Sequence, residues 1–151
     1  MRSSHHLHRR LGRITALQAL KTMASQGELA EAQAATSVAR AGLAEREREV
    51  AAKQSEVASL LDAEALDFAG WRIALAVLGE LSASSEIAAA ETRDCERQEV
   101  GRREQWRQDH TREERAKALL RKVSRRMADK RDDAAMLEMA SLRSQPNGEK
   151  A

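Results

Sequence analysis

Two long stretches of the chain repeat apolar residues at intervals of three and four. The second stretch keeps this spacing at six positions, of which only Lys130 breaks the apolar pattern: Leu120, Val123, Met127, Lys130, Ala134 and Leu137. In the first stretch Leu43, Val50 and Val57 repeat every seven residues, and a broader apolar stripe precedes them over 7–20. This spacing is typical of helices that bury a narrow stripe against a partner helix in a coiled coil. The pattern therefore predicts two paired helical arms.

Helix-weakening residues separate the two arms near the middle of the chain. Gly70, Gly79 and the string SASS at 82–85 form a cluster of such residues, and neither arm contains Pro. We predict one elongated domain over 1–151, with a first helix over about 6–66, a tip or turn over 67–83, a second helix over about 84–142 and a disordered tail over 143–151. Folding back near residue 74 would place residues 7–20 against residues 127–141.

The predicted fold is all-α, a long antiparallel two-helix coiled-coil hairpin with a short apolar helical segment or turn at its tip. Composition agrees, because 33% of the residues are charged, only 2% are aromatic, and Pro146 is the sole proline. Strands are not expected, since Tyr is absent and no alternating apolar runs occur between turn residues.

The expected location is the cytoplasm. Cys95 is the only cysteine, and the first residues lack the apolar segment of a secretory leader. The apolar run over 73–79 lies between Arg72 and Glu80. It is shorter than the roughly 20 residues that a membrane-spanning helix needs, so no direct membrane insertion is expected.

Charge is distributed unevenly along the chain. Residues 1–27, 28–100 and 101–151 carry net charges of +5, −8 and +5, which together give the net charge of +2. In a hairpin, the two basic stretches would meet at the end that holds both termini, and the turn would be acidic.

The most apolar stretch of the chain, DFAGWRIALAVLGELS at 67–82, lies at the predicted tip. One helical stripe consists of Phe68, Trp71, Leu75 and Leu78. Ile73, Val77 and Leu81 lie off that stripe. Because a two-helix hairpin cannot cover two apolar faces, we expect the stripe to bind a partner. The alternative is that all seven residues form a small closing cluster at the tip.

No residue pattern with catalytic content is present. The chain has no Gly-rich phosphate loop and no nucleophile elbow, and we expect no catalytic, cofactor-binding or metal-binding residues, and no enzyme activity. The His5, His6 and His8 cluster has no nearby Cys or carboxylate to complete a metal site. Asp109, His110, Glu113 and Glu114 are expected to form a solvated helix face.

Two segments resemble the terminal arms of a known protein family. LGRITALQALKTMASQGELAEAQ (11–33) opens with apolar residues and ends in LAEAQ, and RRMADKRDDAAMLEMASLR (125–143) is a basic helix that ends in acidic and Ala-rich turns. Together with the length and the scarcity of Pro, these segments resemble the FliJ/YscO (SctO) family. Members of this family are the central stalk proteins of flagellar and virulence type III secretion systems.

The resemblance implies a non-catalytic stalk that docks in the pore of the hexameric secretion ATPase and links it to the inner-membrane export gate. Some members also bind export chaperones. The protein would be a monomer in the cytoplasm, peripherally associated with the secretion apparatus. The residues that would face the ATPase are Arg9, Arg10, Arg13, Arg121, Lys122, Arg125, Arg126 and Arg131. Phe68, Trp71, Leu75 and Leu78 would bind a partner at the tip.

Other functions remain open at this point. The arms could pair between chains in a homo-oligomeric scaffold or export chaperone. The basic segment over 115–126 could bind nucleic acid, although interspersed acids and the lack of stacking aromatic residues disfavour it. The eight basic residues could also be solvated and paired with acids such as Asp129. The sequence does not separate a flagellar from a virulence system.

Overall fold

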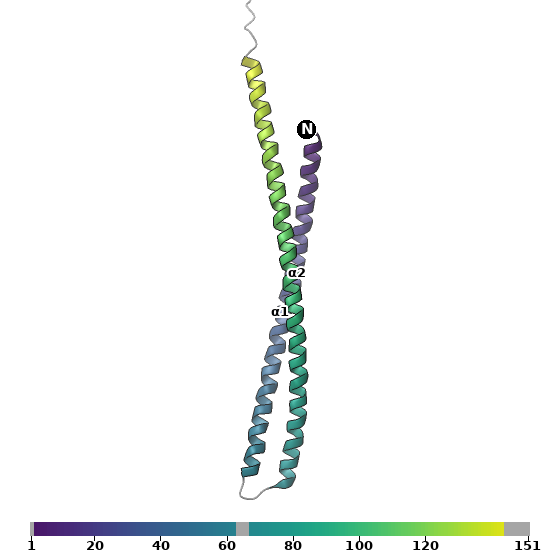
Figure 1. The fold of residues 1–151 in the computed structure, drawn as a ribbon, viewed down its shortest axis with the longest axis vertical. Coiled ribbons are helices and arrows are strands. Elements are labelled where there is room, and N and C mark those ends of the chain that lie inside the picture. Colours follow the sequence, from purple (N-terminus) through teal and green to yellow (C-terminus); the bar gives the residue numbers. More distant parts are fainter. Residues whose placement is uncertain (1, 63–66, 144–151) are drawn as a thin grey trace, which may run out of the picture. The chain divides into compact units, whose positions relative to one another are not determined.

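Over residues 2–62 and 67–143 the protein forms two long helices that pack against each other (Figure 1). This computed structural model describes the backbone of residues 2–62 and 67–143 and the side chains of residues 5–62 and 67–141. Helix α1 spans Arg2–Asp62 and helix α2 spans Phe68–Arg143. The prediction of an all-α protein is confirmed for the described residues.

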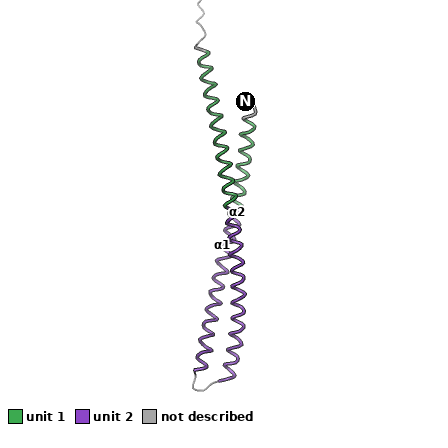
Figure 2. The backbone as a smooth tube through the Cα atoms, in the orientation of Figure 1, with its two compact units in different colours: residues 1–24, 107–151 green, residues 25–106 purple. Residues whose placement is uncertain are grey.

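The chain divides into two compact units, and both helices contribute to each (Figure 2). Unit 1 comprises residues 1–24 and 107–151, and unit 2 comprises residues 25–106. Unit 1 therefore brings the first turns of α1 together with the second half of α2. Unit 2 contains the end of α1 and the start of α2.

In each helix the less exposed side chains follow the spacing of three and four that the sequence shows. In unit 1, α1 contributes His8, Leu11, Thr15, Gln18 and Thr22, and α2 contributes Asp109, Glu113, Ala116, Leu120, Val123 and Met127. In unit 2, the same spacing runs along α1 from Ser25 to Leu60, with Arg46 as an exposed exception, and along α2 from Trp71 to Trp106, with Arg102 as the exception. We call these positions the seam. Their spacing explains why two helices, and not strands, bury this sequence.

The seam is built largely from small and polar side chains. Val57, Ala74 and Ala116 are its buried apolar residues, whereas the buried polar ones are Thr22, Ser25, Thr36, Thr92, Asp109 and Glu113. The Thr36 hydroxyl donates to the Ala32 carbonyl of its own helix at 2.9 Å. Thr92 donates to Ala88 at 2.8 Å and lies 3.3 Å from the Ala39 carbonyl of α1. The helices thus approach closely, but they bury little apolar surface, so the hydrophobic stabilisation per residue is small.

Interhelical contacts within each unit define which residues lie side by side. In unit 2, Arg40 pairs with Glu96 at 2.7 Å and Arg102 pairs with Glu28 at 2.5 Å. In unit 1, His8 Nε2 lies 3.0 Å from the Ser124 hydroxyl. The expectation that residues 7–20 lie against residues 127–141 is therefore wrong, because His8 already meets residue 124.

The predicted start of the second helix, at about residue 84, is also wrong. Helix α2 begins at Phe68, so residues 68–83 are the first turns of a helix and not a separate tip, and the second helix does not start at 84. Asp67 caps the start of α2: its Oδ1 accepts the Gly70 N–H at 3.1 Å and its carbonyl accepts the Trp71 N–H at 2.9 Å. Once α2 has begun, packing on α1 outweighs the low helix propensity of Gly79 and the serines at 82–85.

The predicted start of the first helix and the predicted end of the second helix lie close to the observed ones. Helix α1 begins at Arg2 where about 6 was predicted, and α2 ends at Arg143 where about 142 was predicted. The rest of the predicted tail, residues 144–151, and the predicted end of the first helix over 63–66 lie outside the described residues.

Candidate partner-binding sites

The predicted ATPase-facing residues all belong to unit 1, and all are exposed. Three lie on α1 and five on α2: Arg9, Arg10, Arg13, Arg121, Lys122, Arg125, Arg126 and Arg131. Over the described residues none of the eight forms an ion pair. The predicted alternative pairing with Asp129 is therefore not observed, and the charges of these side chains are available to a partner.

The basic residues of unit 2 behave differently, because many of them are paired with acids. Two pairs join the helices, Arg40 with Glu96 and Arg102 with Glu28. Four pairs lie within one helix: Arg46 with Glu49, Lys53 with Glu56, Arg97 with Asp94 and Arg103 with Glu99. Unit 1 also contains paired basic residues, since Arg112 pairs with Asp109 and Lys117 with Glu113 and Glu114. Over the described residues, exposed basic side chains without ion pairs are therefore more numerous in unit 1 than in unit 2.

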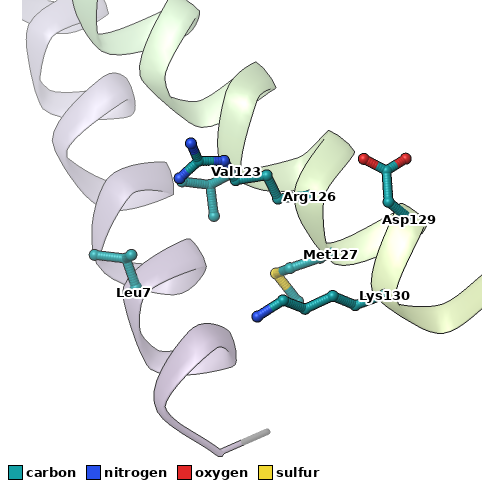
Figure 3. A pocket seen from close by; sticks show the side chains of 6 residues that line it. All are labelled: Leu7, Val123, Arg126, Met127, Asp129 and Lys130. Atoms are coloured by element: carbon teal, nitrogen blue, oxygen red, sulfur yellow. The ribbon is translucent and has the colours of Figure 1, made fainter. Parts of the chain in front are cut away.

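A pocket of about 500 Å³ opens between the two helices in unit 1 (Figure 3). Leu7 lines it from α1, and Val123 and Met127 line it from α2. Arg126 and Lys130 extend toward this space, whereas the Asp129 carboxylate projects away from Leu7 (Figure 3). The pocket combines apolar walls with two cationic groups, so it suits an apolar side chain accompanied by a carboxylate.

The four predicted tip residues do not share one surface. Phe68 and Leu75 are 58% and 44% exposed. Trp71 and Leu78 are half-buried at seam positions beside the buried Ala74. The Phe68 and Trp71 rings contact each other with centroids 5.7 Å apart. Among the side chains at the start of α2, Phe68 and Leu75 are therefore the accessible members of the predicted stripe.

Helix α2 is also long and apolar enough, by length and composition alone, to cross a membrane. Between Phe68 and Ser141 it contains an 18-residue window with a mean hydropathy of 1.4, of which 6% is buried within the protein. The apolar run delimited from the sequence ends at Glu80, but Ile87 and the alanines at 88–90 extend the apolar character beyond it. The expected absence of membrane insertion therefore stays a prediction.

Two acidic residues that the sequence placed on a solvated face are buried in the seam. Asp109 is 5% exposed and Glu113 is 8% exposed, while His110 and Glu114 are exposed as predicted. The signal that could have found them is the seam spacing, since 109, 113, 116 and 120 continue it without a break. The two carboxylates suggested an exposed face, although the spacing alone would have placed both residues in the seam.

The buried acids are stabilised by nearby donors. Lys117 Nζ lies 2.7 Å from Glu113 Oε1 and 3.0 Å from Glu114 Oε1. The hydrogen bond from Lys117, followed by one from Thr22, holds the pKa of Glu113 below its usual value. The same lysine lowers the pKa of Glu114, and both carboxylates raise the pKa of Lys117. In the part of the chain that the structure describes, no group of three or more His, Cys, Asp or Glu side chains could hold a metal ion.

Comparison with known proteins does not assign a family, because no family model, curated protein or solved structure matches the chain. Over the described residues the protein has two helices, a group of exposed basic side chains without ion pairs in unit 1, and exposed apolar residues at the start of its second helix.

Proposed function

We propose that this protein is a non-catalytic stalk and coupling component of a bacterial type III secretion apparatus. Its two helices would form an antiparallel coiled-coil hairpin. The interhelical contacts support this fold, since Glu28 pairs with Arg102 and Arg40, further along α1, pairs with Glu96, which precedes Arg102 in α2. The continuous seam spacing supports the coiled coil.

The observation that carries the proposal is the contrast in charge pairing. The eight predicted residues of unit 1 are exposed and without ion pairs over the described residues, although Arg112 and Lys117 of the same unit are paired with acids. In unit 2, six of the nine basic residues are paired. Unpaired surface charges steer a partner of opposite charge and give contacts that weaken with salt. Such contacts suit a stalk held in the pore of a hexameric secretion ATPase, where tight binding would prevent movement.

The start of α2 would contact the second partner, the export gate at the inner membrane. Phe68 and Leu75 expose apolar surface there, together with Ile73, which is 67% exposed. Apolar residues left uncovered in a helix pair are typical of a protein contact site. The protein would then be cytoplasmic and peripherally associated with the secretion apparatus, with export chaperones as further partners and no cofactor.

A direct test is whether the purified chain binds the hexameric secretion ATPase of its own organism and increases the rate of ATP hydrolysis. The double reversal Arg125→Glu and Arg126→Glu should weaken binding at least tenfold at low salt, and added salt should weaken binding of the unmodified chain. Reversal of Arg72 to Glu in unit 2 is the matched control and should leave ATPase binding unchanged. Equal affinity of the double variant and the unmodified chain at low salt would contradict the proposal.

A homo-oligomeric scaffold or export chaperone is the second candidate. It is favoured by the number of large apolar residues that the two helices leave exposed, which include Leu17, Leu20, Val38 and Ile87. Light scattering on the same preparation separates the two functions. A stable dimer that neither binds nor stimulates the ATPase would favour the scaffold.

A further inference from the structure

Two stripes of exposed side chains run along unit 1 outside the seam. The stripe of α1 has steps of three and four and consists of Leu7, Arg10, Ile14 and Leu17. The stripe of α2 has the same kind of spacing and consists of Arg115, Leu119, Lys122, Arg126 and Lys130. Residues three and four apart lie on one side of a helix, so each stripe is a continuous surface. All nine side chains are exposed.

The two stripes lie on the same side of the helix pair. Leu7 lines the pocket of unit 1 together with Arg126 and Lys130 (Figure 3). Ile14 comes seven residues after Leu7 in α1, and Leu119 comes seven residues before Arg126 in α2. Because the contacts within unit 1 pair later positions of α1 with earlier positions of α2, Ile14 and Leu119 lie at the same level. We call the nine residues of the two stripes the mixed face.

The mixed face carries positive charge in segments without acids. Residues 5–24 of α1 and 115–128 of α2 contain no Asp or Glu. None of the five basic residues of the face forms an ion pair over the described residues. The nearby Asp129 carboxylate projects away from Leu7 (Figure 3). The face therefore combines five cationic side chains with four exposed apolar ones, and these alternate along both helices.

An anionic membrane surface offers contacts to both kinds of side chain. Its headgroups attract Lys and Arg, and the boundary between headgroups and acyl chains accepts Leu and Ile. Nucleic acid would neutralise the cations but leave the four apolar side chains uncovered. The centre of a protein–protein interface is usually depleted of charge, whereas cations here separate the apolar residues from one another. The composition of the face therefore favours a lipid surface as its partner.

We propose that the mixed face binds the surface of an anionic membrane, with both helices of unit 1 lying along it. The four apolar side chains would enter the boundary below the headgroups. The long stems of Lys and Arg would keep their charges among the lipid phosphates and carboxylates. Such a helix pair lies on the membrane and does not cross it.

This inference goes beyond the secretion proposal and does not rest on it. Arg10, Lys122 and Arg126 belong both to the mixed face and to the predicted ATPase-facing residues, so a membrane and the ATPase would compete for unit 1. Leu17, Leu119 and Arg115 belong to the mixed face alone. Variants at these three positions therefore test lipid binding separately.

Co-sedimentation of the full chain with lipid vesicles tests the proposal. The vesicles are phosphatidylcholine with about 30% phosphatidylserine, and the reference vesicles are phosphatidylcholine alone. The unmodified chain should bind the anionic vesicles at least tenfold more tightly than the reference vesicles, and added salt should weaken that binding. Because the assay contains no ATPase, its failure would leave the secretion proposal untouched.

A double charge reversal tests the basic part of the mixed face. Arg115→Glu with Lys122→Glu should weaken binding to the anionic vesicles at least tenfold. The matched control is Arg121→Glu with Arg125→Glu, which changes the net charge equally on the same helix but outside the stripe. Its effect should be much smaller, since a change in net charge alone acts on both pairs of variants in the same way.

A second pair of variants tests the apolar part. Leu17→Ser with Leu119→Ser should also weaken vesicle binding at least tenfold, whereas Leu20→Ser with Met23→Ser should not. Leu20 and Met23 are 63% and 68% exposed but lie outside the stripe. Far-UV circular dichroism verifies that all variants keep their helices.

Three results would overturn the proposal. The first is equal binding to both kinds of vesicle. The second is an equal loss of binding in the mixed-face variants and in their controls. The third is an absence of vesicle binding combined with binding of a helical peptide rich in Glu and Leu, which would assign the mixed face to a protein partner.

Discussion

Lys117 Nζ lies 2.7 Å from Glu113 Oε1, on the side of α2 that packs against α1. The Glu113 carboxylate also forms a hydrogen bond with Thr22 of α1. A buried carboxylate without such donors would be strongly destabilising, so this lysine and this threonine allow an acid to occupy a seam position. The seam of unit 1 consequently contains a polar layer between its apolar residues.

The stability of the helix pair should fall in acid through Glu113. Its pKa is lowered in the folded protein, so its contribution is present above the unfolded value near 4.5 and is lost as the pH falls through the folded value. We expect the melting temperature to decrease as the pH is lowered from about 7 to about 3. Glu113→Gln should reduce this dependence, and Glu86→Gln, an exposed glutamate of unit 2, should not. Identical pH profiles for the two variants would contradict this role.

Replacing a buried hydroxyl of the seam should stabilise the protein. Thr36 is 1% exposed, and its hydroxyl bonds only within its own helix, to the Ala32 carbonyl. Thr36→Val adds apolar surface to the seam and leaves no interhelical group unpaired, so the free energy of unfolding should rise by about 1 kcal/mol. Thr111→Val is the control, because Thr111 makes the same bond to Arg107 but is exposed. Urea unfolding, followed by circular dichroism, should show no increase in the free energy of unfolding for Thr111→Val.

The Asp67 cap should contribute to the stability of unit 2. Asp67→Ala should lower the free energy of unfolding by about 1 kcal/mol, whereas Asp67→Asn retains an acceptor and should cost only a few tenths. Gly70→Ala offers an independent check, since its added Cβ would lie 2.5 Å from Asp67 Oδ2. Gly70→Ala should therefore raise the free energy of unfolding by less than the roughly 1 kcal/mol that a Gly-to-Ala change usually adds in a helix. A full gain would mean that the cap is dispensable.

The exposed and the half-buried residues at the start of α2 should have separable effects. Phe68→Ser with Leu75→Ser should leave the melting temperature nearly unchanged but abolish secretion of a reporter substrate in a strain that lacks the wild-type gene. Leu78→Ser, at a seam position, should instead lower the free energy of unfolding by about 1 to 2 kcal/mol. Normal secretion by a stable Phe68 and Leu75 double variant would remove these residues from the functional surface.

The Trp71→Ala substitution is less informative for the same question. Trp71 is half-buried, and its indole Nε1 is buried without a hydrogen-bond partner among the described residues. Its removal would change packing on α1 as well as the accessible surface. Loss of secretion would then have two explanations, whereas the exposed residues allow only one.

Periodicity in the sequence predicted two helices and part of their seam. The residues identified by spacing that are buried or half-buried are Leu43, Val50, Val57, Leu120, Val123 and Met127, whereas Lys130, Ala134 and Leu137 of the same predicted pattern are exposed. The position of the turn could not be predicted in the same way. Gly70, Gly79 and the serines at 82–85 have low helix propensity, but packing along a long helix compensates for a few weak residues. The start of α2 is instead marked by the single cap at Asp67.

Charge, spacing and helix content are properties of the chain itself, so the sequence determined that unit 1 is basic and that both arms are helical. Burial depends on which residues of α1 lie beside which residues of α2, and only the tertiary structure decided this pairing. It separated Phe68 and Leu75 from Trp71 and Leu78 within one stripe, and it buried Asp109 and Glu113. The physical reason is that a shift in the pairing of two helices changes which side chains are covered while leaving the period of each helix unchanged.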